Sequence, residues 1–142
     1  MRVLVFQHED CEHPGSLRQF LAEDGIEWDA VRLNRGETIP NFDNYDALWV
    51  MGGPMDVWDI EECPWLVAEK VAIREWVSVL GKPYLGLCLG HQLLADALGG
   101  TCGPQKKFQR LEYLRLNSLR KEGEILYFRV QPINKNVSNG IQ

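Results

Sequence analysis

The chain has 142 residues, enough for one domain with a buried core, and its 45% hydrophobic and 25% charged content is ordinary for a globular protein. No apolar run approaches the roughly 20 residues of a membrane span, and the N-terminus is unlike a signal peptide, which excludes a membrane protein and predicts a cytoplasmic one. The net charge of -5 is uneven, and the basic residues of 105–142 lack the interleaved aromatics of a nucleic-acid binder.

Strand and helix signals alternate along the first hundred residues. Four short apolar runs are typical of parallel strands covered on both faces: Val3–Gln7, Trp28–Arg32, Ala47–Met51 and Pro83–Leu87. Stop signals and apolar periodicity predict three helices: Ser16–Asp24, Pro64–Leu80 and His91–Leu98. The longest helix has an expected buried stripe: Leu66, Ile73, Val77 and Leu80. This order predicts a doubly wound, mostly parallel α/β sheet over residues 1–104, followed by an atypical basic tail, 105–142.

A cysteine stands at the end of the last predicted strand, in the run Gly86-Leu87-Cys88-Leu89-Gly90. A nucleophile between two glycines, with a strand before it and a helix after it, is typical of a nucleophile elbow. The glycines leave room for a tight turn, and the positive end of the helix favours a thiolate. Cys88 is therefore the candidate nucleophile, with Leu89 N–H as a donor to an oxyanion.

A second loop, Gly52-Gly53-Pro54, follows the third predicted strand. Because the carboxyl ends of parallel strands meet at one edge of the sheet, we expect this loop to face the same crevice as the elbow. Glycine lets backbone approach a ligand closely, so the loop can supply a second oxyanion donor. Taken alone, it reads as an ordinary turn, and only the pairing with the elbow favours the functional interpretation.

The other histidines and cysteines have simpler interpretations. His91 stands early in a helix that leads away from Cys88, so we expect it to pack or bond locally rather than serve as a base. His8 and His13 lie near the end of the first strand, so they could approach the crevice, but the favoured interpretation is that they are polar loop residues. The cysteines show no metal-binding spacing with these histidines, so no metal site is predicted, and we expect free thiols.

With both loops considered, the first hundred residues resemble class I glutamine amidotransferases, in particular the stand-alone, GMP-synthase-like type. The likeness rests on three runs in this sequence: Met51-Gly52-Gly53-Pro54-Met55, Pro64-Trp65-Leu66, and Gly86-Leu87-Cys88-Leu89-Gly90-His91-Gln92-Leu93-Leu94-Ala95 with Ala97-Leu98-Gly99-Gly100. The resemblance implies a flavodoxin-like fold. It also implies that this fold is incomplete at the C-terminus, since family members are longer.

The resemblance implies glutamine hydrolysis through a thioester on Cys88, which supplies ammonia to a synthetase or another accepting partner. Gly53 and Leu89 would form the oxyanion hole, and Gln92 would help to hold the substrate beside Gly52 and Pro54. The implied chemistry needs no metal and no other cofactor, and neither nucleic acid nor membrane is expected as a partner.

The catalytic His-x-Glu motif that the family carries near its C-terminus has no match in this sequence, which has no histidine after His91. The chain is therefore expected to be impaired as an enzyme. The alternative is a non-catalytic truncated domain, or a module that binds glutamine or a partner. Another cysteine-elbow hydrolase family fits less well, because of the Gly52-Gly53-Pro54 loop. A nucleotide-binding Rossmann domain lacks its G-x-G-x-x-G loop.

The residues from Phe108 onward do not share the resemblance, and the charge balance reverses there: 7 Lys/Arg and 17 Asp/Glu in 1–104 become 8 and 3 in 105–142. When this tail is reverse-translated with permitted codons and read two nucleotides later, one codon choice gives strings similar to the family's segment after the elbow helix. We therefore expect a frame shift near Gln105–Phe108, with the tail out of frame. The coding nucleotide sequence tests this hypothesis.

Overall fold

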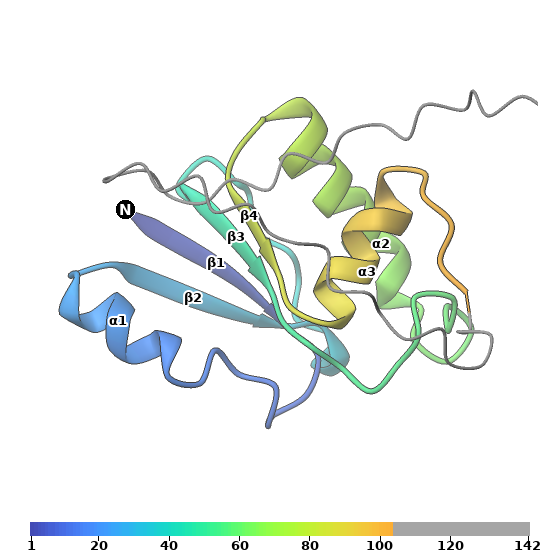
Figure 1. The fold of residues 1–142 in the computed structure, drawn as a ribbon, viewed down its shortest axis with the longest axis horizontal. Helices are drawn as coiled ribbons and strands as arrows, with labels where there is room; N and C mark the ends of the chain where they lie inside the picture. Colours follow the sequence, from blue (N-terminus) through green and yellow to red (C-terminus); the bar gives the residue numbers. More distant parts are fainter. Residues whose placement is uncertain (104–142) are drawn as a thin grey trace, which may run out of the picture. The chain divides into compact units, whose positions relative to one another are not determined.

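The computed structural model describes residues 1–103, and the expectations for the basic tail lie outside the described residues. Four parallel strands form one sheet in the order β2-β1-β3-β4 (Figure 1). Their bounds are β1 Arg2–Gln7, β2 Glu27–Arg32, β3 Ala47–Val50 and β4 Tyr84–Gly86. The central strand β1 is almost completely buried, as predicted for an apolar run covered on both faces. The predicted doubly wound, parallel sheet is confirmed.

Helices cover both faces of the sheet (Figure 1). They are α1 Leu17–Glu23, α2 Trp65–Arg74 with its continuation η2 Glu75–Val79, and α3 Leu89–Ala97. Side chains alternate along each strand, so the sheet contributes to two separate cores. One core lies between the sheet and α1, where Leu21 packs with the buried residues Val3, Val5, Ala47 and Met51. The larger core lies between the sheet and α2 with α3, and its strand residues include Leu4, Phe6, Leu48 and Val50.

The segment from α2 to η2 is one helix with a wide final turn. In η2 the Leu80 N–H bonds the Glu75 carbonyl five residues back, at 3.0 Å, instead of the usual four. Trp76, three residues after Ile73, is still fully buried, whereas Leu80 at the end of the wide turn is 41% exposed. The predicted stripe is therefore correct at Leu66 and Ile73 and wrong at Leu80.

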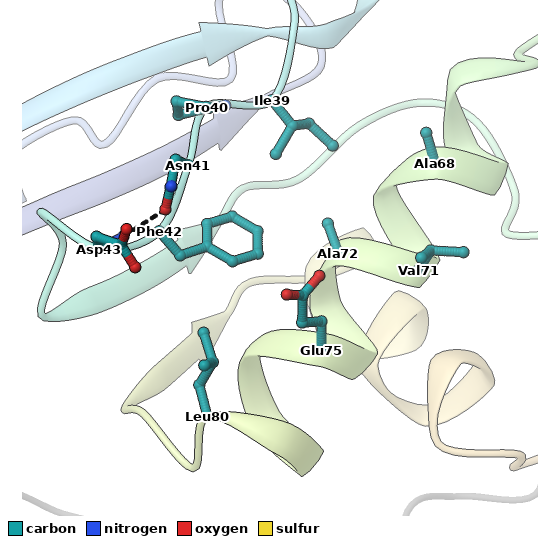
Figure 2. A pocket seen from close by; sticks show the side chains of 10 residues that line it. All are labelled: Ile39, Pro40, Asn41, Phe42, Asp43, Ala68, Val71, Ala72, Glu75 and Leu80. Atoms are coloured by element: carbon teal, nitrogen blue, oxygen red, sulfur yellow. Dashed lines mark hydrogen bonds between the residues drawn. The ribbon is translucent and has the colours of Figure 1, made fainter.

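A groove of about 500 Å³ lies between residues 39–43 and α2 with η2 (Figure 2). Apolar and acidic side chains line it together, among them Phe42, Val71 and Glu75. Phe42 and Leu80 of the groove come just before β3 and β4, at the edge where these parallel strands begin. The cysteine elbow comes just after β4, at the opposite edge, where the strands end. The groove is thus separate from the elbow. Within residues 1–103, no helix is long and apolar enough to cross a membrane.

Candidate active site

Cys88 sits on the turn between β4 and α3, at the N-cap of α3. Its backbone angles are φ 49° and ψ -105°, and among the described residues no other non-glycine residue has a positive φ. Such a conformation costs about 1–3 kcal/mol and persists only where the surrounding structure enforces it. The side chain is exposed. The local geometry is that of a strained elbow presenting a thiol to solvent.

Two glycines allow α3 to pack directly on the strands beneath the elbow. An ideal Cβ built at Gly90 would lie 2.2 Å from the Val50 carbonyl oxygen, and one at Gly86 would lie 2.7 Å from the Gly90 carbonyl carbon. The Leu87 N–H extends the β3–β4 pairing to Val50 O at 2.9 Å. The Tyr84 hydroxyl donates to the Gly90 carbonyl at 2.7 Å, and burial raises the pKa of Tyr84. The elbow therefore rests on a close backbone contact.

The loop Gly52-Gly53-Pro54 lies beside the elbow, as the shared sheet edge predicts. An ideal Cβ at Gly53 would be 2.5 Å from Met55 Sδ, 2.8 Å from Leu89 Cδ2 and 3.1 Å from His8 Cβ, so a side chain there would have to displace its neighbours. Gly53 and Leu89, the predicted oxyanion donors, are thus brought together. Their role as donors stays a prediction.

The remaining predicted site residues differ in exposure, and Gly52 is buried. Pro54 and Gln92 are exposed, and the Gln92 carbonyl accepts a hydrogen bond from Cys102 Sγ at 3.4 Å. His91 is exposed at the start of α3, where its backbone N–H bonds Cys88 O at 3.1 Å; the local role expected of its ring stays a prediction. His13 is an exposed loop residue that accepts from Gly15 N–H, as expected. All four cysteines are free.

His8 lies in the loop after β1, as the sequence suggested, but it is buried there and approaches the glycine loop of the site, which the favoured interpretation missed. Its side chain is completely buried, with Nδ1 2.8 Å from the Gly52 carbonyl oxygen and Nε2 2.9 Å from Glu69 Oε1. The ring stacks on Trp65, with 5.5 Å between the ring centroids and 14° between the planes. A signal was present in the sequence: Glu69 falls on the buried face of α2, between Leu66 and Ile73, and a buried carboxyl group needs a partner.

The pKa values of both members of the His8–Glu69 pair are raised. Burial disfavours the charged imidazole, but the hydrogen bond and charge of Glu69, the Gly52 carbonyl and the charge of Glu12 together outweigh burial and raise the pKa of His8. Burial raises the pKa of the Glu69 carboxyl group more than His8 lowers it. Both directions agree that the pair gives up its proton at a higher pH than separate side chains would. Within residues 1–103, Glu69 Oε2 has no hydrogen-bond partner.

The model of the glutamine amidotransferase class-I family matches residues 10–130. The chain belongs to this family. The match covers both loops of the site and continues beyond residue 104 into the basic segment. The expected change of character in that segment stays a prediction.

Similar proteins carry related names. The glutamine amidotransferase-like protein YfeJ of Salmonella typhimurium is 34% identical over 113 residues, which are 75% of this chain and 47% of the relative. Gamma-glutamyl peptidase 3 of Arabidopsis thaliana is 29% identical over 107 residues, 73% of this chain and 41% of the relative. The glutamine-hydrolyzing GMP synthase of Aeropyrum pernix is 48% identical over 68 residues, 48% of this chain and 11% of the relative.

A solved structure supports the same fold. The crystal structure of a glutamine amidotransferase from Thermotoga maritima superimposes with a TM-score of 0.66 at 31% identity, covering 70% of this chain and 43% of that one. The flavodoxin-like fold of class I glutamine amidotransferases is thereby confirmed. The chain spans about half, or less, of the length of the relatives that it matches.

Proposed function

We propose that Cys88 is a nucleophile that takes the γ-glutamyl group of glutamine to form a thioester. The observation that carries this proposal is the backbone of Cys88, strained at φ 49° and exposed at the N-terminus of α3. Strain of this kind concentrates at functional sites, where it aims a side chain that a relaxed turn would not. Membership of the class I glutamine amidotransferase family supports the choice of substrate.

The proposed reaction has two steps. The Cys88 thiolate attacks the side-chain amide carbon of glutamine and an S–C bond forms. The C–N bond then breaks as the amide nitrogen takes up the proton that the thiol lost and leaves as ammonia. Water then attacks the thioester and releases glutamate and the thiol. The backbone N–H groups of Gly53 and Leu89 stabilise the oxyanion of each tetrahedral intermediate. Gln92, Gly52 and Pro54 contact the rest of the substrate.

The proton transfers in these steps lack an evident histidine. The sequence contains only His8, His13 and His91, and both ring nitrogens of His8 are engaged in the interior. We infer that thioester formation is slow and that turnover is impaired in the chain as its sequence stands. Ammonia from any turnover would go to a synthetase partner, an inference based on the relative named a glutamine-hydrolyzing GMP synthase. The alternative is a module that binds a glutamyl ligand or a partner without chemistry.

A γ-glutamyl peptide is a second candidate substrate, since one of the similar proteins is named a γ-glutamyl peptidase. Both substrates present the same γ-carbonyl to the same thiol. They differ in the leaving group, which is ammonia for glutamine and an amine for a peptide. Release of ammonia or of a free amine, followed over hours with each compound, separates the two.

Labelling with a diazoketone analogue of glutamine tests the proposed nucleophile. We expect a mass increment on Cys88 that excess glutamine prevents, with little or no glutaminase turnover. Cys88→Ser should abolish the label, whereas Cys11→Ser, which removes another exposed thiol, should leave it unchanged. Absence of the label in a folded protein would favour the non-catalytic module. Full glutaminase turnover would contradict the inference that the proton-transfer base is missing.

A further inference from the structure

We propose that His8, held in place by Glu69, is a positioning residue that orients the Gly52–Gly53 peptide and thereby aims the Gly53 N–H at the oxyanion. This inference rests on the proposed function, which makes Gly53 a donor. His8 itself touches neither the substrate nor the thiol. It acts through the backbone of the loop.

The geometry of a trans peptide makes this control direct. The peptide is planar, so the carbonyl of Gly52 and the N–H of Gly53 point in opposite directions. No cis peptide occurs among residues 1–103. The His8 Nδ1 contact of 2.8 Å holds the Gly52 carbonyl toward the interior, so the Gly53 N–H faces the other way. Two successive glycines have few preferences of their own, so an outside anchor is needed to fix them.

The anchor is itself fixed in both tautomer and position. A carbonyl oxygen only accepts hydrogen bonds, so His8 Nδ1 must carry a hydrogen. Glu69 secures this arrangement at Nε2, either as a carboxylate that accepts from a charged imidazole or as an acid that donates to a neutral one. In both forms Nδ1 keeps its hydrogen. Stacking on Trp65 prevents rotation of the ring.

An activated ester isolates the oxyanion donor from the missing base. In the nitrophenyl γ-ester of glutamate, the Cys88 thiolate attacks the ester carbon, the S–C bond forms, and the C–O bond breaks as nitrophenolate leaves with its electron pair. The thiol proton goes to solvent, and the leaving group needs no acid. Alkylation by iodoacetamide consumes the same thiolate without forming an oxyanion. The ratio of the two rates therefore reports on the oxyanion donors and cancels changes in the thiol.

Two double variants differ only in the donor to Gly52. Both carry Glu69→Gln, which avoids leaving a charged carboxylate buried without a partner. His8→Asn keeps an amide nitrogen close to the place of Nδ1, whereas His8→Gln moves it toward Nε2 and away from Gly52. A lost oxyanion donor typically costs 10²–10³-fold, and a misaimed one less. We expect the ratio of acylation to alkylation to fall by about 10–100-fold in the His8→Gln double variant and by less than about threefold in the other.

Two spectroscopic readouts keep this test decisive. The carbonyl carbon resonance of Gly52 should move in the His8→Gln double variant and stay near the wild-type value in the His8→Asn one. In the unmodified chain, the nitrogen resonances of His8 should show a protonated Nδ1. This second measurement stands even if both variants unfold.

The outcomes separate this inference from the proposed function. If Cys88 of the unmodified chain is alkylated but never acylated, the proposed function fails, and the Gly52 and His8 resonances still decide whether His8 orients the loop. If the ester acylates Cys88 and both folded variants show the wild-type ratio, the positioning role is overturned. An unprotonated Nδ1 overturns it as well.

Discussion

Replacing Gly90 by alanine tests how closely α3 must pack on β3. The added Cβ would stand 2.2 Å from the Val50 carbonyl oxygen, whereas ordinary contacts begin at 3.4 Å, so helix and strand must separate by about 1 Å. Overpacking of this kind costs about 1–3 kcal/mol, and a rigid backbone neighbour argues for the upper end. Alanine returns about 1 kcal/mol through its higher helix propensity. The expected net loss in the free energy of unfolding is about 2 kcal/mol.

Urea unfolding followed by tryptophan fluorescence measures this loss, because Trp76 is fully buried. A matched control is Gly103→Ala, where a Cβ would meet nothing within 4 Å and φ is not in the left-handed range. The control should stay within about 0.5 kcal/mol of the unmodified chain. A Gly90→Ala protein as stable as the control would refute the close backbone contact and, with it, the account of how the elbow is held.

Two further predictions concern charged groups in the described residues. Lys82→Met should cost about 2 kcal/mol, because Nζ donates to two backbone carbonyls at 2.9 and 2.8 Å. Lys70→Met, which removes a pair with Asp96 and no hydrogen bond to a backbone carbonyl, should cost less than about 1 kcal/mol. Equal losses in urea unfolding would contradict this ranking. The free energy of unfolding should fall as pH rises above 6.5, by up to about 1.4 kcal/mol per pH unit, because the folded His8–Glu69 pair keeps a proton that the unfolded chain loses. Urea titrations from about pH 6 to 9 should show this slope, and Glu69→Gln should reduce it; an unchanged slope would show that another group titrates.

Much of the fold could be predicted because short apolar runs, bounded by turns, leave few alternatives to buried parallel strands. The predicted helix Pro64–Leu80 also matches α2 and η2 closely. What could not be predicted is the wide turn at Glu75–Val79. Trp76, inside this turn, packs edge-on against Phe42 and donates to the Pro83 carbonyl, contacts with other segments that periodicity does not reveal. Periodicity alone therefore placed Leu80 inside.

Part of the candidate site could likewise be predicted from the sequence, and part could not. Cys88 and its two glycines form a local pattern, and a local turn needs only neighbouring residues to be recognised. The approach of Gly53 to Leu89 could also be expected, since both follow adjacent parallel strands. His8 could not be placed, because its partner Glu69 is 61 positions away. A polar residue after a strand reads as a loop residue until that partner is known.

The burial of His8 and Glu69 is hard to explain by stability alone. Ion pairs and polar pairs in protein interiors often contribute less than apolar residues of similar size, and here one carboxyl oxygen has no partner in the described part of the chain. An apolar pair could also fill the space beside Trp65, but it could not donate to the Gly52 carbonyl. An apolar replacement would lose that hydrogen bond, which acts on the same peptide group that carries the proposed oxyanion donor, the Gly53 N–H. The polar pair is therefore better explained by the orientation of the loop than by the stability of the core.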